Sequence, residues 1–185
     1  MAKVLVVYST IDGHTVEICD RIRRALTAAG NDVSTVELTA DTTIDPDPFD
    51  ALIIGASIRY GKHRPNVAEF IEKHVDTLRS KPSAFFSVNA VARKPEKREP
   101  HTNPYVRKFL ASISWEPALV GVFGGKIDYP KYDFMDKTMI RFIMWMTKGP
   151  TDPAGTFEFT NWDDVDAFAQ RFAELVSIGS NTRDG

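Results

Sequence analysis

Near its N-terminus the chain reads Val4-Leu5-Val6-Val7-Tyr8-Ser9-Thr10-Ile11-Asp12-Gly13-His14-Thr15. A short apolar run rich in valine leads into a polar loop with a glycine, and a helical pattern follows at once. A strand that is apolar on both faces is typical of a parallel sheet covered by helices on both sides. The stretch therefore predicts a buried parallel strand whose loop opens directly into a helix.

The loop after this strand offers hydroxyl groups and free backbone N–H groups at the start of the helix. A helix start carries partial positive charge and unpaired donors, so it suits a phosphate. The loop lacks the G-x-x-x-x-G-K-[ST] pattern of ATP and GTP P-loops and the G-x-G-x-x-G pattern of Rossmann dinucleotide sites. It also lacks lysine and arginine, which suits a tightly held monophosphate cofactor. The alternative is an ordinary strand-to-helix turn in which Thr15 or Asp12 caps the helix.

Length and composition indicate one globular domain. The 185 residues can bury a sizeable core, and the formal net charge is only −2. The single cysteine excludes an internal disulfide, and we expect Cys19 to be a small buried side chain rather than a reactive thiol. We expect no signal peptide, and no apolar run approaches the roughly 20 residues that span a bilayer. These features predict a cytoplasmic chain, either soluble or attached to a surface.

Strands and helices alternate along the chain. The predicted strands are 3–8, 32–37, 51–55, 84–88 and 119–123, and the predicted helices are 14–29, 65–79, 104–113 and 162–177. This order predicts an α/β fold with a five-stranded parallel sheet of the flavodoxin-like kind, with helices on both faces. We expect a single domain over 1–178 with an insertion at about 125–156 that interrupts strand five, and a flexible tail over 179–185.

A second loop follows the third predicted strand and reads Gly55-Ala56-Ser57-Ile58-Arg59-Tyr60-Gly61. Its glycines allow tight turns, and Tyr60 could stack on a flat ring. The alternative is a turn with a half-exposed tyrosine. In a doubly wound sheet this loop and the first one meet beyond the strand ends. A phosphate site and a flat-ring site at one edge indicate flavin mononucleotide (FMN).

A third loop, 89–102, follows the fourth predicted strand. Between residues 93 and 108 there are six lysines or arginines against two glutamates. Such a cluster could attract a substrate with carboxylates or an anionic membrane surface. The alternative is a solvated loop, which is the usual meaning of a charge run.

The predicted insertion contains an amphipathic helix, 134–146. At about 100° per residue, one half carries Phe134, Met135, Thr138, Met139, Phe142, Ile143, Trp145 and Met146. The other half carries Asp133, Asp136, Lys137, Arg141 and Lys148, with Ile140 and Met144 among them. Either the apolar half packs on the core, or it forms a surface for a membrane or a large apolar ligand. We favour the surface, because the five-stranded core already has its helices.

Three motifs carry a family resemblance: Ser-Thr-x-Asp-Gly-x-Thr at 9–15, Gly-Ala-Ser-Ile-Arg-Tyr-Gly at 55–61 and Ser-Val-Asn-x-Val-Ala-Arg-Lys-Pro-Glu-Lys-Arg at 87–98. Together with the insertion, they resemble the long-chain type of the flavodoxin superfamily. Within it they are similar to the bacterial menaquinone-dependent protoporphyrinogen IX dehydrogenases. The resemblance covers roughly residues 3–175. It implies FMN-dependent oxidation of protoporphyrinogen IX to protoporphyrin IX in haem biosynthesis, with a membrane quinone as electron acceptor.

The resemblance also implies the site. The expected FMN-binding residues are Ser9, Thr10, Ile11, Asp12, Gly13, His14, Thr15, Ser57, Ile58, Arg59, Tyr60, Gly61, Ser87, Val88 and Asn89. The expected contacts to substrate carboxylates are Arg59, Arg93, Lys94, Lys97 and Arg98. No catalytic side chain and no metal site are expected, because the flavin carries the chemistry.

One feature of the family pattern is missing from this chain. Tyr60 falls on an aromatic that flanks the flavin, but the second flanking aromatic is absent from loop three. Either Phe86 or Tyr105 replaces it, or that face stays open to substrate, which we prefer because hydride transfer needs access. Asp12, a poor neighbour for a phosphate, is expected to cap the helix or orient the loop.

The implied partners are protoporphyrinogen IX, menaquinone or ubiquinone, and an anionic membrane surface at the inner face of the cell membrane, with no nucleic acid. Three alternatives stay open: an NAD(P)H-dependent FMN quinone reductase, a flavodoxin-type electron carrier, and a structural domain without a cofactor. The low net charge and the basic loop count against a carrier, since carriers are strongly acidic. No second nucleotide motif supports the reductase.

Overall fold

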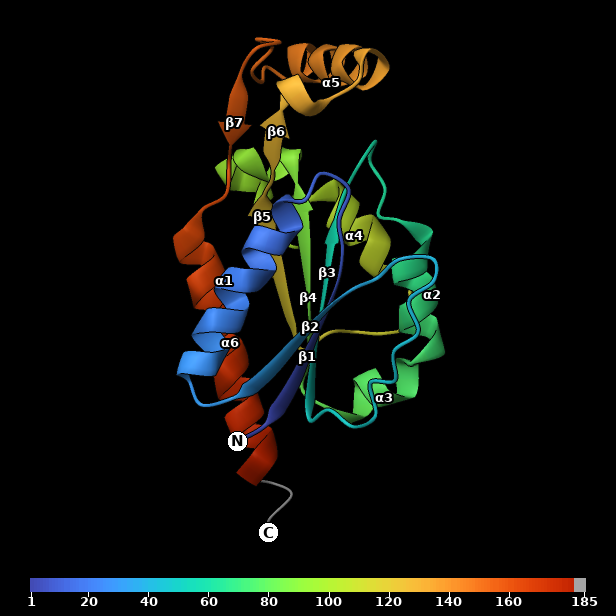
Figure 1. The fold of residues 1–185 in the computed structure, drawn as a ribbon, viewed down its shortest axis with the longest axis vertical. Helices are drawn as coiled ribbons and strands as arrows, with labels where there is room; N and C mark the ends of the chain where they lie inside the picture. The colour runs from blue at the N-terminus through green and yellow to red at the C-terminus, as the bar shows by residue number, and fades with distance from the viewer. Residues whose placement is uncertain (182–185) are drawn as a thin grey trace.

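The computed structural model describes residues 1–181, and Figure 1 shows one parallel sheet between two layers of helices. The five strands lie in the order β2-β1-β3-β4-β5, and every neighbouring pair is parallel. Their bounds are β1 (Lys3–Ser9), β2 (Asp32–Glu37), β3 (Ala51–Ser57), β4 (Ser83–Asn89) and β5 (Leu119–Gly124). The predicted flavodoxin-like fold class is therefore confirmed.

Two sets of helices cover the sheet. One face carries α1 (His14–Ala28) and α6 (Trp162–Asn181), and the other carries α2 (Pro65–Lys73), α3 (Val75–Ser80) and α4 (Pro104–Leu110) (Figure 1). The helix predicted over 65–79 is divided at His74. The last helix runs to Asn181, past the end predicted near Ser177, and residues 182–185 of the predicted tail lie outside the described residues.

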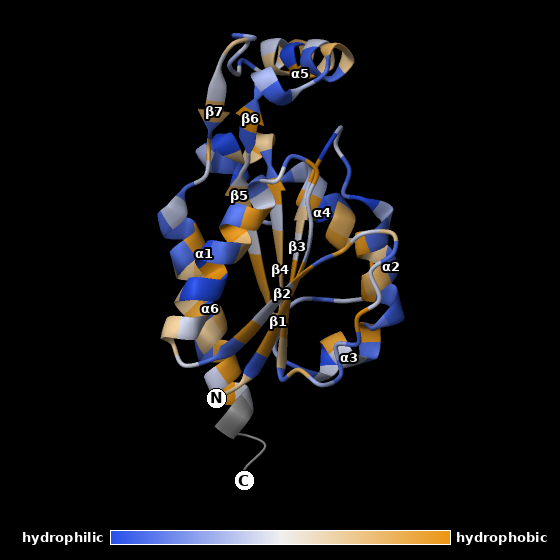
Figure 2. Cartoon of the chain, in the orientation of Figure 1, coloured by the Kyte–Doolittle hydropathy of each residue, from blue (hydrophilic) through white to orange (hydrophobic). Residues whose placement is uncertain are grey.

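The core lies on both sides of the sheet because β1 alternates its side chains between two apolar clusters. Val4 and Val6 face α1 and α6, whereas Leu5 and Val7 face α2 and α3. Figure 2 shows the resulting apolar strands between helices that are polar on the outside. Cys19 is buried in α1, and this burial raises the pKa of its thiol, as expected for an inert side chain.

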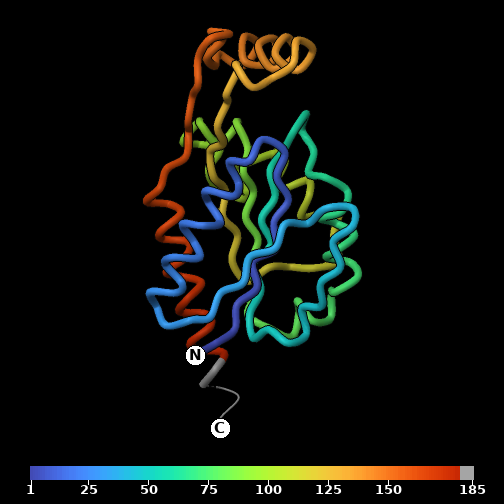
Figure 3. The backbone as a smooth tube through the Cα atoms, in the orientation of Figure 1, coloured from blue at the N-terminus to red at the C-terminus, as the bar shows by residue number. Residues whose placement is uncertain are grey.

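The insertion stands beyond the C-terminal edge of the sheet. It consists of β6 (Lys126–Asp128), a 3-10 turn (Tyr129–Lys131), α5 (Phe134–Met146) and β7 (Thr156–Glu158), and we call these residues, 126–158, the arm. Figure 3 traces how the two strands leave the sheet side by side and carry α5 at their far end. β7 pairs antiparallel with β6 and not with the main sheet.

No helix within residues 1–181 combines the length and apolarity that crossing a bilayer requires.

Candidate functional site

A cavity of about 710 Å³ lies between the C-terminal edge of the sheet and the arm. Of the residues predicted from the sequence, it is lined by Thr10, Asp12, His14, Thr15, Ser57, Ile58, Arg59, Tyr60, Gly61, Val88, Asn89 and Arg93. The lining does not include the other predicted residues, which are Ser9, Ile11, Gly13, Ser87, Lys94, Lys97 and Arg98. Three loops that are far apart in the sequence therefore meet where the parallel sheet predicts.

The first loop is shaped for an anion. The backbone N–H of Gly13 donates to Thr10 Oγ1 at 3.0 Å, and Gly13 has φ of +83°, which favours glycine. Among the described residues no side chain caps the start of α1, so the alternative of an ordinary turn capped by Thr15 or Asp12 is wrong. Thr15 is only 1% exposed, and its Oγ1 has no hydrogen-bond partner among residues 1–181. A buried hydroxyl without a partner costs free energy, so this atom fits an oxygen of a bound phosphate.

Asp12 binds Arg59 instead of the helix. Arg59 Nη2 donates to Asp12 Oδ1 at 3.0 Å, and Arg59 Nη1 lies 3.2 Å from Asp136 Oδ2 in α5. The Tyr60 hydroxyl also donates to Asp136. Burial raises the pKa of Asp12, and the guanidinium of Arg59 opposes that shift. Two carboxylates therefore balance the positive charge of Arg59. Its contacts also join the first two loops to the start of α5.

Aromatic side chains flank the cavity. Tyr60 adopts φ of 51°, an uncommon conformation for a residue with a side chain, and its ring lines the cavity. Tyr105 also lines it, and a Cβ at Gly61 would lie 3.1 Å from Tyr105 Cε1. Phe86 is buried in the core, so of the two replacements considered from the sequence only Tyr105 reaches the site.

The hydroxyl of Ser57 is a second buried side-chain oxygen without a partner, and it lines the same cavity. Unpartnered hydroxyls at both the first and the second loop, with tyrosines between the loops and the arm, fit a phosphorylated flavin.

The third loop is held by a buried polar network. The Ser87 hydroxyl contacts His63 Nε2 at 3.0 Å and accepts from Asn89 Nδ2 at 3.2 Å. Asn89 Oδ1 accepts from Ala92 N and from Asn103 Nδ2, both at 3.1 Å. Burial lowers the pKa of His63 to about 4. Ser87 thus supports the loop from below. The three sequence motifs did not reveal His63, the partner of Ser87, or Asn103, the partner of Asn89, because neither lies in a motif.

Arg93 lines the cavity and reaches the far end of α5. Its Nη2 donates to Thr147 O at 2.7 Å and to Thr147 Oγ1 at 2.9 Å, and its Nη1 donates to Ala90 O at 3.0 Å. All three acceptors are neutral, and no carboxylate of the described residues forms an ion pair with Arg93. Burial lowers its pKa without making the guanidinium neutral near pH 7.

The roof of the cavity is one face of α5. Its contributing side chains are Met139, Ile140, Ile143, Met144 and Met146. Ile140 and Met144, assigned to the polar half from the sequence, pack inward with Ile127 and Tyr129. Phe134 and Trp145 of the predicted apolar half are 84% and 70% exposed. Ile143 of the same half packs in the cluster with Met144, so the interpretation of this half as a surface agrees with the structure only in part.

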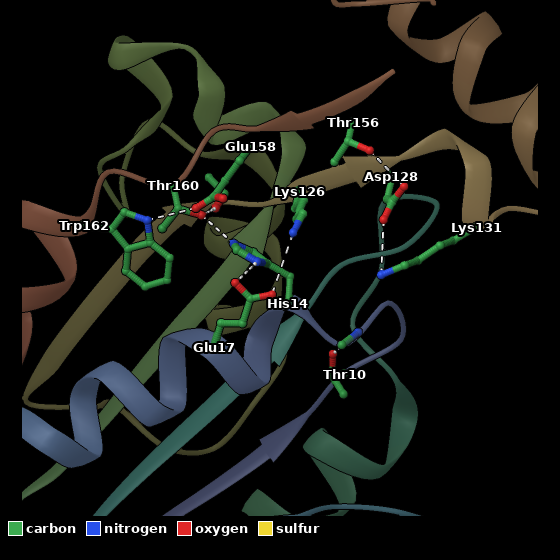
Figure 4. A network of polar contacts seen from close by, with 12 residues as sticks. Thr10, His14, Glu17, Lys126, Asp128, Lys131, Thr156, Glu158, Thr160 and Trp162 are labelled. Carbon is green, nitrogen blue, oxygen red and sulfur yellow. Dashed lines mark hydrogen bonds and ion pairs between the residues drawn. The ribbon is translucent and has the colours of Figure 1, made fainter. Parts of the chain in front are cut away.

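Lys126 is a cavity residue that the sequence motifs did not reveal. It lies at the start of β6, lines the main cavity, and also lines an adjoining cavity of about 230 Å³ with Asp12 and His14. Figure 4 shows its side chain running toward the first turn of α1, where Nζ lies 3.8 Å from Glu17 Oε1. The signal that could have found it is the position of Gly124-Gly125-Lys126 after the fifth strand, at the same sheet edge.

His14 is neutral in this arrangement. Thr160 Oγ1 donates to Gly124 O at 2.7 Å, so it accepts from His14 Nε2 at 2.6 Å (Figure 4). Nε2 therefore carries a proton, and Nδ1 faces Glu17 Oε2 at 3.5 Å. Burial lowers the pKa of His14 and keeps it uncharged near pH 7.

Comparisons with known proteins agree with this architecture. The family model described as "Flavodoxin domain" matches residues 5–154. The chain is 42% identical over 174 residues to "Protoporphyrinogen IX dehydrogenase [quinone]" of Escherichia coli strain K12, covering 94% of this chain and 96% of that protein. It is 43% identical to the Leishmania major protein of the same name, covering 94% of this chain and 75% of that protein. Oxidised flavodoxin 2 from Bacillus cereus superimposes with a TM-score of 0.54 at 20% identity, covering 94% and 99%. At this sequence identity, the similarity to flavodoxin 2 shows only that the two proteins share a fold.

Proposed function

The chain belongs to the flavodoxin domain family, and on this premise we propose that it oxidises protoporphyrinogen IX to protoporphyrin IX with FMN as cofactor and a quinone as electron acceptor, in haem biosynthesis. The observation that carries the proposal is the cavity at the sheet edge, which joins unpartnered buried hydroxyls to an apolar roof. The relatives at 42% and 43% identity supply the reaction class.

The cofactor would be held by the first two loops. Thr15 Oγ1 and the free N–H groups at the start of α1 bind the phosphate, while Thr10 holds the loop in shape through Gly13. Tyr60 and Tyr105 border the flavin ring, and Ser57 donates its hydroxyl. When bound, FMN would supply the redox chemistry: it would accept a hydride from the substrate in each two-electron step, with loss of a proton from the substrate, and pass the electrons to the quinone.

Arg93 is the best candidate for a substrate carboxylate among the five predicted cations. Arg59 is neutralised by Asp12 and Asp136, and Lys94, Lys97 and Arg98 do not line the cavity. Arg93 lines it with only neutral acceptors, so its charge is available to an anion. An Arg–carboxylate pair with one propionate of the tetrapyrrole would place the macrocycle under the apolar roof.

The arm is the part of the molecule that would contact the membrane. Phe134, Met135, Phe142 and Trp145 expose apolar surface along α5. Exposed basic residues lie on the same arm, at Lys131, Arg141 and Lys148. Aromatic and basic side chains together suit the interface of an anionic bilayer, which also dissolves the quinone. We therefore place the protein peripherally at the inner face of the cell membrane.

Vesicle co-sedimentation tests this attachment. Trp145→Asp should lower binding to phosphatidylglycerol vesicles several-fold while leaving the melting temperature unchanged, because the side chain is exposed. Ile178→Asp, at an exposed apolar residue in the C-terminal part of α6, is the matched control and should bind as the wild type does, because that end of the helix lies at the opposite end of the molecule from α5 (Figure 1). Equal binding of both variants and the wild type would remove α5 from the membrane contact.

The reaction is tested anaerobically with FMN-loaded protein and protoporphyrinogen IX. Absorbance of the oxidised flavin should bleach without quinone and recover when a menaquinone analogue is added. Arg93→Gln should raise KM with little change in kcat, and Lys97→Gln, outside the cavity, should change neither. No bleaching by the substrate, with bleaching by NADPH instead, would support the quinone reductase.

A further inference from the structure

Of the two lysines that the arm brings near the first loop, Lys126 and Lys131, only Lys126 lines the main cavity. Thr10, Thr15, Asp12 and His14 line the main cavity with it, although β6 is more than a hundred residues away in the sequence. Its side chain points from β6 to the first turn of α1 (Figure 4). The loop itself carries no lysine or arginine, so its charge balance depends on residues from other elements.

The first turn of α1 carries a carboxylate, Glu17, and no lysine or arginine. Arg59 already compensates Asp12, and it is shared with Asp136. His14 is neutral, so it offers no charge. Glu17 remains as a carboxylate beside the site, and it would repel a phosphate dianion if nothing screened it.

The present partner of Lys126 holds it loosely. Nζ lies 3.8 Å from Glu17 Oε1, and the side chains of Lys126 and Glu17 are 27% and 53% exposed. An ion pair this long and this open to water contributes little, because water screens it and the lysine loses rotamer freedom. Lys126 can therefore turn its ammonium group to a stronger anion at small cost.

We propose that Lys126 pairs with the phosphate of bound FMN and thereby couples the arm to cofactor affinity. The inference rests on the proposed function, because it requires that FMN occupies the first loop. Thr15 Oγ1, which is buried and without a partner, marks where a phosphate oxygen is received. A phosphomonoester dianion is the ligand chemistry that needs both this hydroxyl and an ammonium group.

The test compares flavins with and without the phosphate. Dissociation constants of FMN and riboflavin are measured by quenching of flavin fluorescence for the wild type and for Lys126→Gln. The variant should bind FMN about tenfold more weakly, as for loss of one charged hydrogen bond, and should bind riboflavin as the wild type does. Lys126→Arg, which keeps the charge, should restore most of the FMN affinity.

Lys148→Gln is the matched control, because Lys148 is an exposed lysine of the same arm and lines neither cavity. It should leave both dissociation constants unchanged. Equal FMN affinity in Lys126→Gln and the wild type would overturn the inference and leave Lys126 as a partner of Glu17. Equal weakening of FMN and riboflavin would overturn it too, since the role would then be structural. Failure of the wild type to bind FMN would reject the proposed function together with this inference.

Discussion

The pH dependence of the free energy of unfolding below pH 6.5 tests how tightly His63 is packed beneath the cavity. Its ring packs on Phe109 with centroids 4.5 Å apart, and its Nε2 lies 3.0 Å from Ser87 Oγ. Burial in this apolar site lowers the pKa of His63 from 6.5 to about 4. Because the folded pKa lies below the unfolded one, the unfolded chain binds the proton more tightly. The contribution of His63 to the free energy of unfolding is therefore present above pH 6.5 and is lost as the pH falls from there toward 4.

The size of this loss follows from the two pKa values. Between pH 7 and pH 5, proton linkage with 6.5 unfolded and about 4 folded removes about 2 kcal/mol from the free energy of unfolding. The full loss, reached below pH 4, is about 3 kcal/mol. For a chain of this size, a loss of about 2 kcal/mol lowers the melting temperature by about 4–8 °C.

Urea unfolding of the cofactor-free protein at pH 7 and pH 5 measures the effect. His63→Gln keeps an N–H group that can reach Ser87 but does not titrate, so the wild type should lose about 2 kcal/mol more than this variant between the two pH values. His101→Gln, at an exposed histidine, should lose as much as the wild type. Equal losses in the wild type and His63→Gln would refute the reasoning, because His63 would then titrate alike in both states.

Three further outcomes are expected. Gly55→Ala should destabilise the fold by about 1–3 kcal/mol in urea unfolding, since its Cβ would lie 2.1 Å from Phe86 Cζ; unchanged stability would mean that the ring moves away freely. Cys19 should resist a thiol reagent in the native protein and react only after unfolding, because it is buried and its thiol pKa is raised; fast native labelling would contradict this. Asp136→Asn should weaken the contact with Arg59 and speed hydrogen exchange in α5 but not in β1; equal exchange in both proteins would show that the pair does not hold the arm.

The arm is held over the cavity by polar contacts at both ends of α5. Asp136 near its start binds Arg59 and Tyr60, and Thr147 after its end binds Arg93. These contacts use two of the cations expected to bind substrate. The three motifs therefore predicted which loops border the cavity, although one of these cations, Arg59, pairs with Asp12 of the first motif and with Asp136, which lies in no motif.

The sequence by itself determined the sheet, its order of strands and helices, and the edge at which the loops meet. Apolar runs such as residues 4–7 and helical spacing such as 14–28 are local patterns, and a parallel sheet brings the ends of its strands together whatever the side chains are. The glycine in the loop before the first helix, Gly13, is also part of a local pattern. A tight turn at that point requires a positive φ, which glycine adopts without strain.

Only the tertiary structure decided which charges meet and which face of α5 is covered. Asp12 and Arg59 are 47 residues apart, and Arg93 and Thr147 are 54 apart, so no spacing rule connects them. A helical projection separates Ile140 from Phe134 but does not say which side finds neighbours. That choice depends on Ile127 and Tyr129, which another part of the chain supplies. Lys126 reaches the first turn of α1 for the same reason: packing of the arm on the sheet edge, not any local preference, brings the two together.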